Sequence, residues 1–135
     1  MNYKETIDKI FTMKSIAVVG MSPKPERPSH YVALYLKENG YYIIPVNPGH
    51  SKIAGMKSYS NLLDIPSKVD IVNIFRRPEH VLPIVKEAIK INAKAVWLQD
   101  GIINEKAAKL ATSKNLFFVM NDCMLRRHHQ LLKKV

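Results

Sequence analysis

The sequence predicts an α/β protein built on a doubly wound parallel sheet of about five strands with helices on both faces. Three observations lead to this prediction. Short apolar runs alternate along the chain with stretches of helical periodicity. The helical stretches are roughly 10 to 15 residues long, which is typical of connections between parallel strands. Residues that favour turns and helix caps stand between the two kinds of segment.

Five short runs, rich in β-branched or aromatic residues, are predicted strands. They cover residues 16–19, 41–46, 69–74, 95–98 and 117–120. Runs that are almost wholly apolar are typical of parallel strands that are buried on both faces. We expect the strand order 3-2-1-4-5, which is common among doubly wound sheets.

Predicted helices lie at 3–13, 29–39, 82–91, 104–114 and 124–133. Ser29 and Asn104 are suited to cap the N-termini of their helices, and Gly40 is suited to end the second one. Asp122 is expected to cap the last helix. A turn or short helical piece is expected near residues 60–66.

The chain length of 135 residues predicts a single domain over residues 1–135. The N-terminal stretch is mixed in charge and the apolar runs are short, so neither a signal peptide nor a membrane span is predicted. Cys123 is the single cysteine, which is typical of a reducing compartment. We therefore expect a cytoplasmic protein with no membrane partner, and a homodimer is compatible with a domain of this size.

The strong positive charge predicts an anionic partner. Lysine and arginine number 21 against 11 acidic residues, which gives a net charge of +10. A nucleic acid and a small, highly phosphorylated ligand both fit this charge. The basic residues are dispersed and are not interleaved with aromatic ones, which disfavours a specific nucleic-acid site.

The segment after the first strand, GMSPKPERPS, is a candidate phosphate loop. Gly20 allows a turn into a helix near Ser29, which is how Rossmann-like proteins hold a phosphate on backbone N–H groups. Three prolines stiffen the loop where a dinucleotide fingerprint has glycines. Lys24 and Arg27 would add charge for a phosphate; the alternative is that both are solvated.

The residues after the second strand distinguish between nucleotides. An NAD site places an acidic residue there for the ribose hydroxyls, whereas this chain has Asn47 and Pro48. Lys52, a few residues further on, would suit a phosphate on the ribose. The sequence thus disfavours NAD and leaves NADP and a 3′-phosphorylated nucleotide open, beside the alternative that Asn47 and Pro48 only form a turn.

Two further strand ends add candidate ligand-binding residues. Phe75 and Arg76 follow the third strand and suit stacking and phosphate binding. Trp97 belongs to the fourth strand, Gln99 follows it and suits an amide, and Gly101 allows close backbone approach. The alternative for Phe75 and Trp97 is a place in the core.

No catalytic centre is predicted. Cys123, His128 and His129 are close in sequence, but they form an incomplete set of metal ligands. We expect both histidines to be structural or solvated, and Cys123 to lie at the ligand-bearing edge because it follows the last strand. Asp100 and Asp122 are isolated carboxylates. Binding without catalysis is therefore expected.

Five motifs in order give the chain a resemblance to a known family. They are IAVVGMSPKPERPS, IIPVNPGH, VDIVNIFRRPEHV, AVWLQDGIINEKAA and VMNDCM. With them, the chain from about residue 13 to 129 resembles the small stand-alone CoA-binding proteins. Their single domain is similar to the nucleotide-binding domain in the α subunit of succinyl-CoA synthetase.

The resemblance implies a Rossmann-like fold with coenzyme A, free or as an acyl-CoA, across the carboxyl ends of the strands. It implies that the diphosphate lies along Gly20, Met21, Ser22 and Arg27, in the loop that also holds Lys24 and Ser29. Asn47, Pro48 and Lys52 would lie by the adenosine 3′-phosphate, and Phe75, Arg76, Trp97, Gln99 and Gly101 along the rest of the ligand. CoA carries three phosphates, which suits a basic loop without a ribose-binding acid.

The C-terminal motif departs from this family. The family commonly has Glu-His in the tail, whereas Arg127 precedes His128 here. The second domain of the synthetase and its phosphorylated histidine have no counterpart in this sequence. The resemblance therefore does not imply ligase activity.

Overall fold

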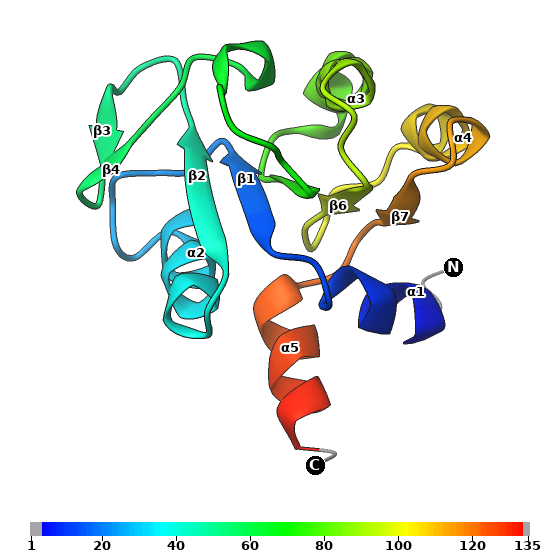
Figure 1. Ribbon diagram of the computed structural model, residues 1–135, viewed down its shortest axis with the longest axis horizontal. Coiled ribbons are helices and arrows are strands. Elements are labelled where there is room, and N and C mark those ends of the chain that lie inside the picture. The colour runs from blue at the N-terminus through cyan, green and yellow to red at the C-terminus, as the bar shows by residue number, and fades with distance from the viewer. Residues whose placement is uncertain (1–3, 134–135) are drawn as a thin grey trace.

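The computed structural model describes residues 4–133 and contains a five-stranded parallel sheet with helices on both faces (Figure 1). The sheet consists of β1 (Ser15–Val19), β2 (Tyr42–Val46), β5 (Ile71–Ile74), β6 (Ala95–Leu98) and β7 (Phe117–Val119). Each strand falls on a predicted one, with ends that differ by two residues or fewer. The predicted Rossmann-like α/β fold is confirmed.

The strand order is β2-β1-β5-β6-β7, which corresponds to 2-1-3-4-5 when the sheet strands are counted along the chain. The predicted order 3-2-1-4-5 is therefore wrong. After β2 the chain crosses back and adds β5 to the other side of β1. The apolar pattern of a strand does not encode which side of the sheet it joins. The direction of winding consequently reverses between β1 and β5, and such a switch point is where doubly wound sheets bind ligands.

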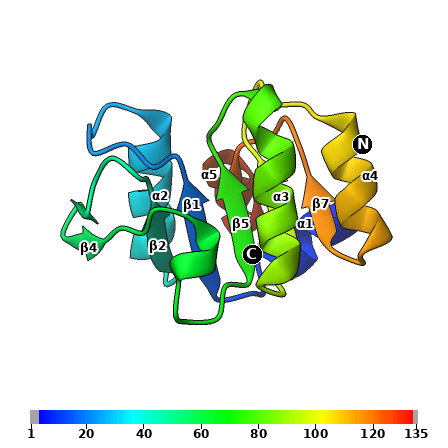
Figure 2. The same ribbon diagram turned by 90° about the horizontal axis from the view of Figure 1, so that it is seen from above.

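Three helices pack on one face of the sheet and two on the other, and Figures 1 and 2 show these two layers. The first group is α1 (Lys4–Ile10), α2 (Pro28–Glu38) and α5 (Met124–Leu132), and the second is α3 (Val81–Lys90) and α4 (Glu105–Ser113). The core has two halves because the sheet separates them: Ile16 and Val18 belong to the first, Ala17 and Val19 to the second. Among the described residues, no helix is long and apolar enough to cross a membrane.

Two of the four cap assignments are confirmed. Asn104 caps α4 by accepting the Ala107 N–H at 2.9 Å, and Gly40 follows α2 with φ +96°. Ser29 is not a cap, because Pro28 begins the helix and Arg27 is its N-cap residue. A proline has no N–H to leave unpaired, so it suits the first helical position.

The connection from β2 to β5 contains a small hairpin that the sequence did not predict. It pairs β3 (Lys52–Ile53) with β4 (Met56–Lys57), and Ala54 and Gly55 form the turn with φ +51° and +78°. Strands of two residues are too short to show the alternation of apolar and polar residues that predicts a strand. The connection continues into η1 (Leu62–Asp64), a short 3-10 helix that confirms the predicted helical piece.

Edge strand β2 contains a proline, Pro45. Its carbonyl accepts the Tyr59 N–H at 3.1 Å on the side away from β1. A proline is tolerated in an edge strand because its missing N–H faces outward. The same position discourages another strand from pairing with this edge.

His128 is a buried histidine with aromatic neighbours. Its Nδ1 lies 2.9 Å from the Tyr35 hydroxyl, and its ring meets the rings of Phe11 and Tyr41 at steep angles. Burial, together with the charge of His129, lowers the pKa of His128 below the usual 6.5. The expectation that His128 is structural agrees with this position, and His129 is exposed.

We expect this histidine to make the fold less stable in mild acid. The unfolded chain takes up a proton near pH 6.5, while folded His128 resists protonation. Stability is therefore complete above pH 6.5 and falls below it, by at most about 1.4 kcal/mol per pH unit. Thermal melts from about pH 7.5 to 5.5 should show a shallower decline for His128→Gln than for the parent. His80→Gln, which removes an exposed histidine in another part of the chain, should keep the parental slope, and equal slopes in all three proteins would contradict the assignment.

Candidate functional site

The carboxyl ends of β1 and β5 meet at the switch point of the sheet. The Phe75 N–H donates to the Val19 carbonyl at 2.9 Å, and the Gly20 N–H donates to the Val46 carbonyl at 2.8 Å. These bonds extend the strand pairing by one step beyond the strands themselves. The loops that leave β1, β2 and β5 therefore begin side by side.

Gly20 is required at this point for a packing reason. Its φ is +86°, and a Cβ built on it would lie 2.7 Å from the Phe75 carbonyl oxygen and 3.0 Å from Cδ of Arg76. An L side chain would meet both a strained backbone and a backbone clash. The glycine thus lets the β5 loop, with Arg76, pass directly over the end of β1.

The loop from Met21 to Ser29 is held closed by its own hydrogen bonds. The Ser22 N–H donates to Oγ of Ser29 at 2.9 Å, and Nδ1 of His30 donates to the Ser22 carbonyl at 2.8 Å. From the next strand, Nδ2 of Asn47 donates to the Met21 carbonyl at 2.9 Å. Sequence reasoning did not predict the role of His30, which is buried behind the loop. A preorganised loop loses less entropy when it binds a ligand.

A cavity of about 440 Å³ opens beside this loop, at the ends of β5 and β6. Four predicted site residues line it: Phe75, Arg76, Gln99 and Gly101. Cys123 also lines it, so this cysteine lies at the carboxyl edge of the sheet, as expected from its place after the last strand. The remaining lining residues are Pro28, Tyr31, Val32, Arg77, Pro78, Asp100 and Ile102. Of these, Tyr31 is 48% exposed and gave no signal in the sequence beyond its place in a helix.

A smaller cavity of about 140 Å³ lies on the other side of Arg76, over the ends of β1 and β2. Its lining includes Pro48, another predicted site residue, together with Val19, Val46, Ser60, Asn61, Leu62, Ile84 and Glu87. Arg76 lines both cavities and is half-buried between them. We call the two cavities together the switch-point crevice.

Four cations lie in or near this crevice: Arg76 and Arg77 line it, and Lys24 and Arg27 belong to the loop that leads to Pro28 on its lining. Lys24, Arg27 and Arg77 are exposed, and Arg76 is half-buried. Within the described part of the chain, none of the four forms an ion pair. Their charge is therefore directed at solvent or at an anionic ligand.

One lining residue of the larger cavity, Gln99, is hydrogen-bonded to a second buried amide, Asn73. Nε2 of Gln99 donates to Oδ1 of Asn73 at 2.8 Å, and both residues are more than nine-tenths buried. Nδ2 of Asn73 has no hydrogen-bond partner among the described residues. Asn73 could have been found from the sequence, since it is the single polar residue of β5 (IVNI), but it was not predicted. An unpaired buried N–H is costly, so this position is suited to an acceptor on a ligand or a water.

None of the other predicted site residues lines either cavity. The side chains of Trp97 and Met21 are fully buried, and the Trp97 indole N–H donates to the Asp122 carbonyl at 2.8 Å. Both side chains belong to the core, which agrees with the alternative stated for Trp97. Lys52 lies on the β3–β4 hairpin and is exposed. Its predicted contact with a 3′-phosphate stays a prediction.

Paired charges fix the start of α5 at the rim of the larger cavity. Arg126 binds both carboxylate oxygens of Asp100, at 2.9 and 3.0 Å, and Arg127 binds Asp122 at 2.9 Å. The bond from Arg126 is the main reason that the pKa of Asp100 is lowered. Burial alone would raise the pKa of Asp122, but hydrogen bonds from Arg127 and the Cys123 N–H outweigh it and lower the pKa.

Asp122 is therefore an ion-pair partner, and the prediction that it caps α5 is wrong. Cys123 is the N-cap residue of that helix. The carboxylate of Asp122 is instead drawn to the two arginines in the first turn of α5. Arg127, which departs from the pattern of the resembled family, acquires a structural role through this pair.

Comparisons with known proteins indicate the family of the chain. The chain matches the model of the CoA binding domain over residues 14–129. It is 39% identical over 115 residues to an uncharacterized protein of Bacillus subtilis (strain 168), and the match covers 85% of each chain. It is 40% identical over 103 residues to the ADP-forming acetate–CoA ligase II of Archaeoglobus fulgidus, but this match covers 74% of the chain and 15% of the ligase.

A solved structure supports the same assignment. A protein from Pyrococcus horikoshii OT3 superposes with a TM-score of 0.92 at 44% sequence identity, and the match covers 96% of this chain and 92% of that one. The likeness to the ligase is therefore a likeness to one part of a longer protein, whereas the likeness to the Pyrococcus protein extends over nearly its whole length. The chain belongs to the CoA binding domain family.

Proposed function

We propose that this protein binds coenzyme A or an acyl-CoA in the switch-point crevice and catalyses no reaction on it. The observation that supports this most is the position of Arg76, which lies half-buried between the two cavities without an ion-pair partner in the described chain. An extended ligand with phosphates near its middle would fill both cavities and neutralise that charge. CoA has this layout, with the diphosphate between adenosine and pantetheine.

The donor set around the crevice fits CoA group by group. Arg76, Arg77, Lys24 and Arg27 suit the phosphates, because guanidinium and ammonium groups form charge-assisted bonds to them. The Asn73–Gln99 amide pair suits the amide groups of the pantetheine arm, which both donate and accept. Apolar lining from Phe75, Val32 and Ile102 suits the methylene groups of the arm.

Binding is proposed rather than catalysis because the carboxylates beside the cavity are already engaged. Asp100 and Asp122 are in ion pairs with Arg126 and Arg127. These pairs keep both carboxylates ionised and lower their pKa values. A carboxylate held in this way is a poor proton donor or acceptor near neutral pH.

Thermal unfolding with added ligand tests the proposal. A ligand that binds only the native state raises the melting temperature, by an amount that grows with the logarithm of its concentration relative to its dissociation constant. We expect CoA and acetyl-CoA at millimolar concentration to raise it, and NAD to leave it unchanged. NADP belongs in the panel as the main alternative. No shift with either CoA species would refute the proposal, and a larger shift with NADP would favour a Rossmann-type NADP protein.

A comparison with dephospho-CoA tests the proposed role of Lys52. Loss of the 3′-phosphate should weaken binding roughly tenfold, because one charge-assisted hydrogen bond contributes on the order of 1.5 to 3 kcal/mol. Lys52→Ala should weaken binding of CoA but change binding of dephospho-CoA little, since its partner is already missing. Arg27→Ala should weaken both ligands.

Titration calorimetry with both ligands measures these affinities, and Lys86→Ala on α3 serves as the control for a lost surface charge. Equal affinity of the parent protein for CoA and dephospho-CoA would overturn the assignment of Lys52. It would leave the role of the Gly20 loop untouched.

A further inference from the structure

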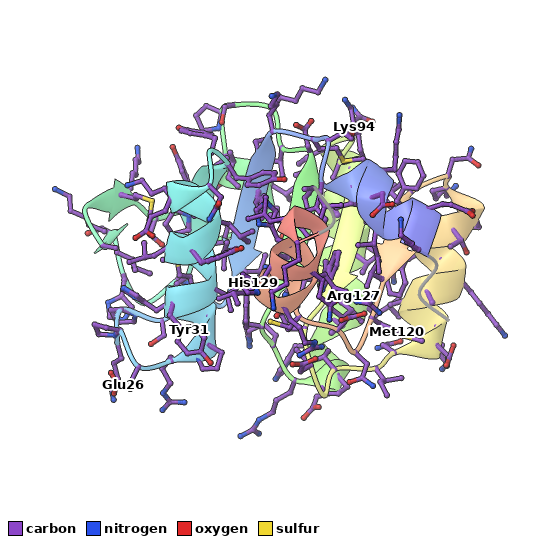
Figure 3. All side chains as sticks on the ribbon, turned by 90° about the horizontal axis from the view of Figure 1, so that it is seen from below. Glu26, Tyr31, Lys94, Met120, Arg127 and His129 are labelled. Atoms are coloured by element: carbon purple, nitrogen blue, oxygen red, sulfur yellow. The ribbon has the colours of Figure 1, made fainter. Side chains whose placement is uncertain are left out.

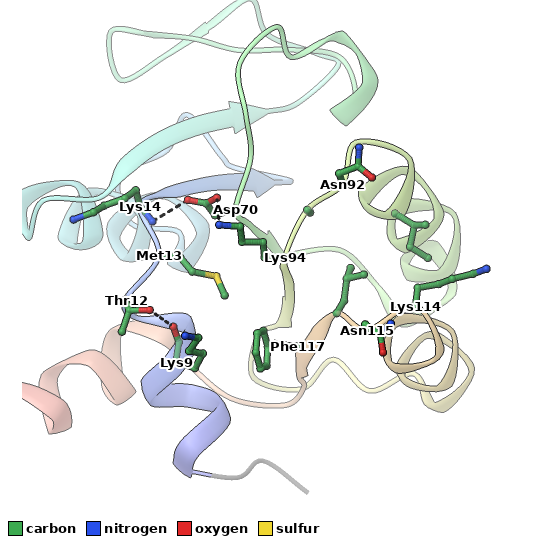
Figure 4. A pocket seen from close by; sticks show the side chains of 13 residues that line it. Lys9, Thr12, Met13, Lys14, Asp70, Asn92, Lys94, Lys114, Asn115 and Phe117 are labelled. Carbon is green, nitrogen blue, oxygen red and sulfur yellow. Dashed lines mark hydrogen bonds and ion pairs between the residues drawn. The ribbon is translucent and has the colours of Figure 1, made fainter.

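A further cavity lies at the opposite edge of the sheet from the switch-point crevice. Its volume is about 580 Å³, and it is formed where α1 ends, where β1 and β6 begin, and where α4 turns into β7 (Figure 4). Figure 3 shows the separation, with Lys94 at the edge where the strands begin and Tyr31, beside the crevice, at the other. A cavity of roughly 300 to 1,000 Å³ is large enough for a small organic ligand. Nothing in the proposed CoA site accounts for this cavity.

The lining of this cavity is basic. It contains four lysines, Lys9, Lys14, Lys94 and Lys114, and a single carboxylate, Asp70. Figure 4 shows that Lys14 and Lys114 extend outward from the rim, while Lys94 reaches back over the opening toward Asp70. Lys9, Lys14 and Lys114 have no ion-pair partner in the described part of the chain.

The carboxylate of Asp70 offsets only part of this charge, because it is one anion among four lysines and the fold already uses both of its oxygens. Oδ2 accepts the N–H groups of Lys14 and Ser15 at 3.0 and 3.2 Å. Oδ1 lies 3.7 Å from Nζ of Lys94. Asp70 is 7% exposed and thus belongs to the floor of the cavity. The cavity opening keeps a net positive charge that attracts anions.

An exposed aromatic ring stands beside these lysines. Phe117, the first residue of edge strand β7, is 37% exposed, and its ring borders the hollow next to Lys9 (Figure 4). Met13 extends into the same space from the other side and offers a thioether surface. A ring that is open to solvent between cations is suited to a flat ligand that carries negative charge.

We propose that this cavity binds a nucleoside phosphate, with its base against Phe117 and its phosphates near Lys9, which lies beside that ring and has no ion-pair partner among the described residues. The phosphates explain the lysines, and the base explains the exposed ring; inorganic phosphate or a free nucleoside would use only one of the two features. Asn92 and Asn115, at the rim, add amide groups for the sugar or the base. This site is independent of the proposed CoA site.

Titration of the protein with ATP, followed by amide chemical shifts, locates the site directly. We expect shifts to centre on residues 9–14, 92–94 and 114–117. Inorganic tripolyphosphate and adenosine should each bind at least about fivefold more weakly than ATP, because stacking and charge each contribute part of the affinity. Shifts centred on the Gly20–Ser29 loop, or none at millimolar ATP, would overturn the proposal.

Variants assign the two parts of the site. Phe117→Ala should remove most of the advantage in affinity of ATP over tripolyphosphate. If the alanine variant fails to fold, Phe117→Leu, which also lacks the aromatic ring, should show the same loss. Lys9→Gln should weaken both ligands about threefold, whereas Lys109→Gln on the exposed face of α4 should change neither. Arg76→Ala should leave ATP binding intact. If this variant no longer binds ATP, then ATP binds in the switch-point crevice and the proposal is wrong.

Discussion

Replacement of Gly20 by alanine is expected to destabilise the protein by about 2 to 4 kcal/mol, which corresponds to a melting temperature lower by roughly 8 to 15 °C. Two costs add at this position. The backbone φ of +86° is unfavourable for an L residue, and the new Cβ would lie 2.7 Å from the Phe75 carbonyl oxygen. Because the clash is with backbone, relief requires the loops after β1 and β5 to separate.

The same change should reduce affinity for CoA. Cδ of Arg76 would lie 3.0 Å from the new Cβ, so the arginine would be displaced from its place between the two cavities. Calorimetry below the lowered melting temperature separates this effect from unfolding. We expect a loss of affinity even where the variant is fully folded.

Gly40→Ala is the matched control for the backbone cost. Gly40 has a similar φ of +96°, but a Cβ there meets nothing within 4 Å. Gly40→Ala should therefore lower the free energy of unfolding by only about 1 kcal/mol and leave CoA binding unchanged. If Gly20→Ala and Gly40→Ala destabilise equally, then the contact with the Phe75 carbonyl contributes nothing and this account of Gly20 fails.

The sequence predicted the strands and the fold class because both depend on local patterns. A buried parallel strand is an apolar run of a few residues, as in β6 (AVWL), and each such run was found. The strand order depends on which side of β1 the chain returns to after β2. That choice is made by packing over long sequence separations, so no local pattern contains it.

The candidate site was predictable at the level of loops but less so at the level of side chains. Phe75, Arg76 and Gln99 reach the cavity because strand ends in a parallel sheet share one edge. Trp97 lies two residues before Gln99 on the same side of β6, but deeper, where the sheet and α5 exclude solvent. Asn73 was not predicted, although it is the single polar residue of β5.

Arg76 is the residue on which the proposed function depends most. It lines both cavities of the switch-point crevice and is half-buried, whereas Arg77 lines the larger cavity alone and is exposed. Charge-assisted hydrogen bonds strengthen as the surroundings exclude water. The two neighbouring arginines therefore form a matched pair that differs mainly in burial.

Arg76→Ala is expected to weaken binding of CoA by about 10-fold to 100-fold, because loss of a partly buried charge-assisted bond costs on the order of 1.5 to 3 kcal/mol. Arg77→Ala should cost about threefold or less, as exposed ion pairs do. Arg76→Lys should recover only part of the affinity, since an ammonium group cannot form two parallel bonds to a phosphate. Titration calorimetry of the four proteins measures these differences.

Neither arginine has an ion-pair partner within the described residues, so unliganded melting temperatures should stay close to the parent value. Equal losses for Arg76→Ala and Arg77→Ala would mean that CoA meets the crevice only at its exposed rim, and the proposed path of the ligand between the two cavities would be wrong.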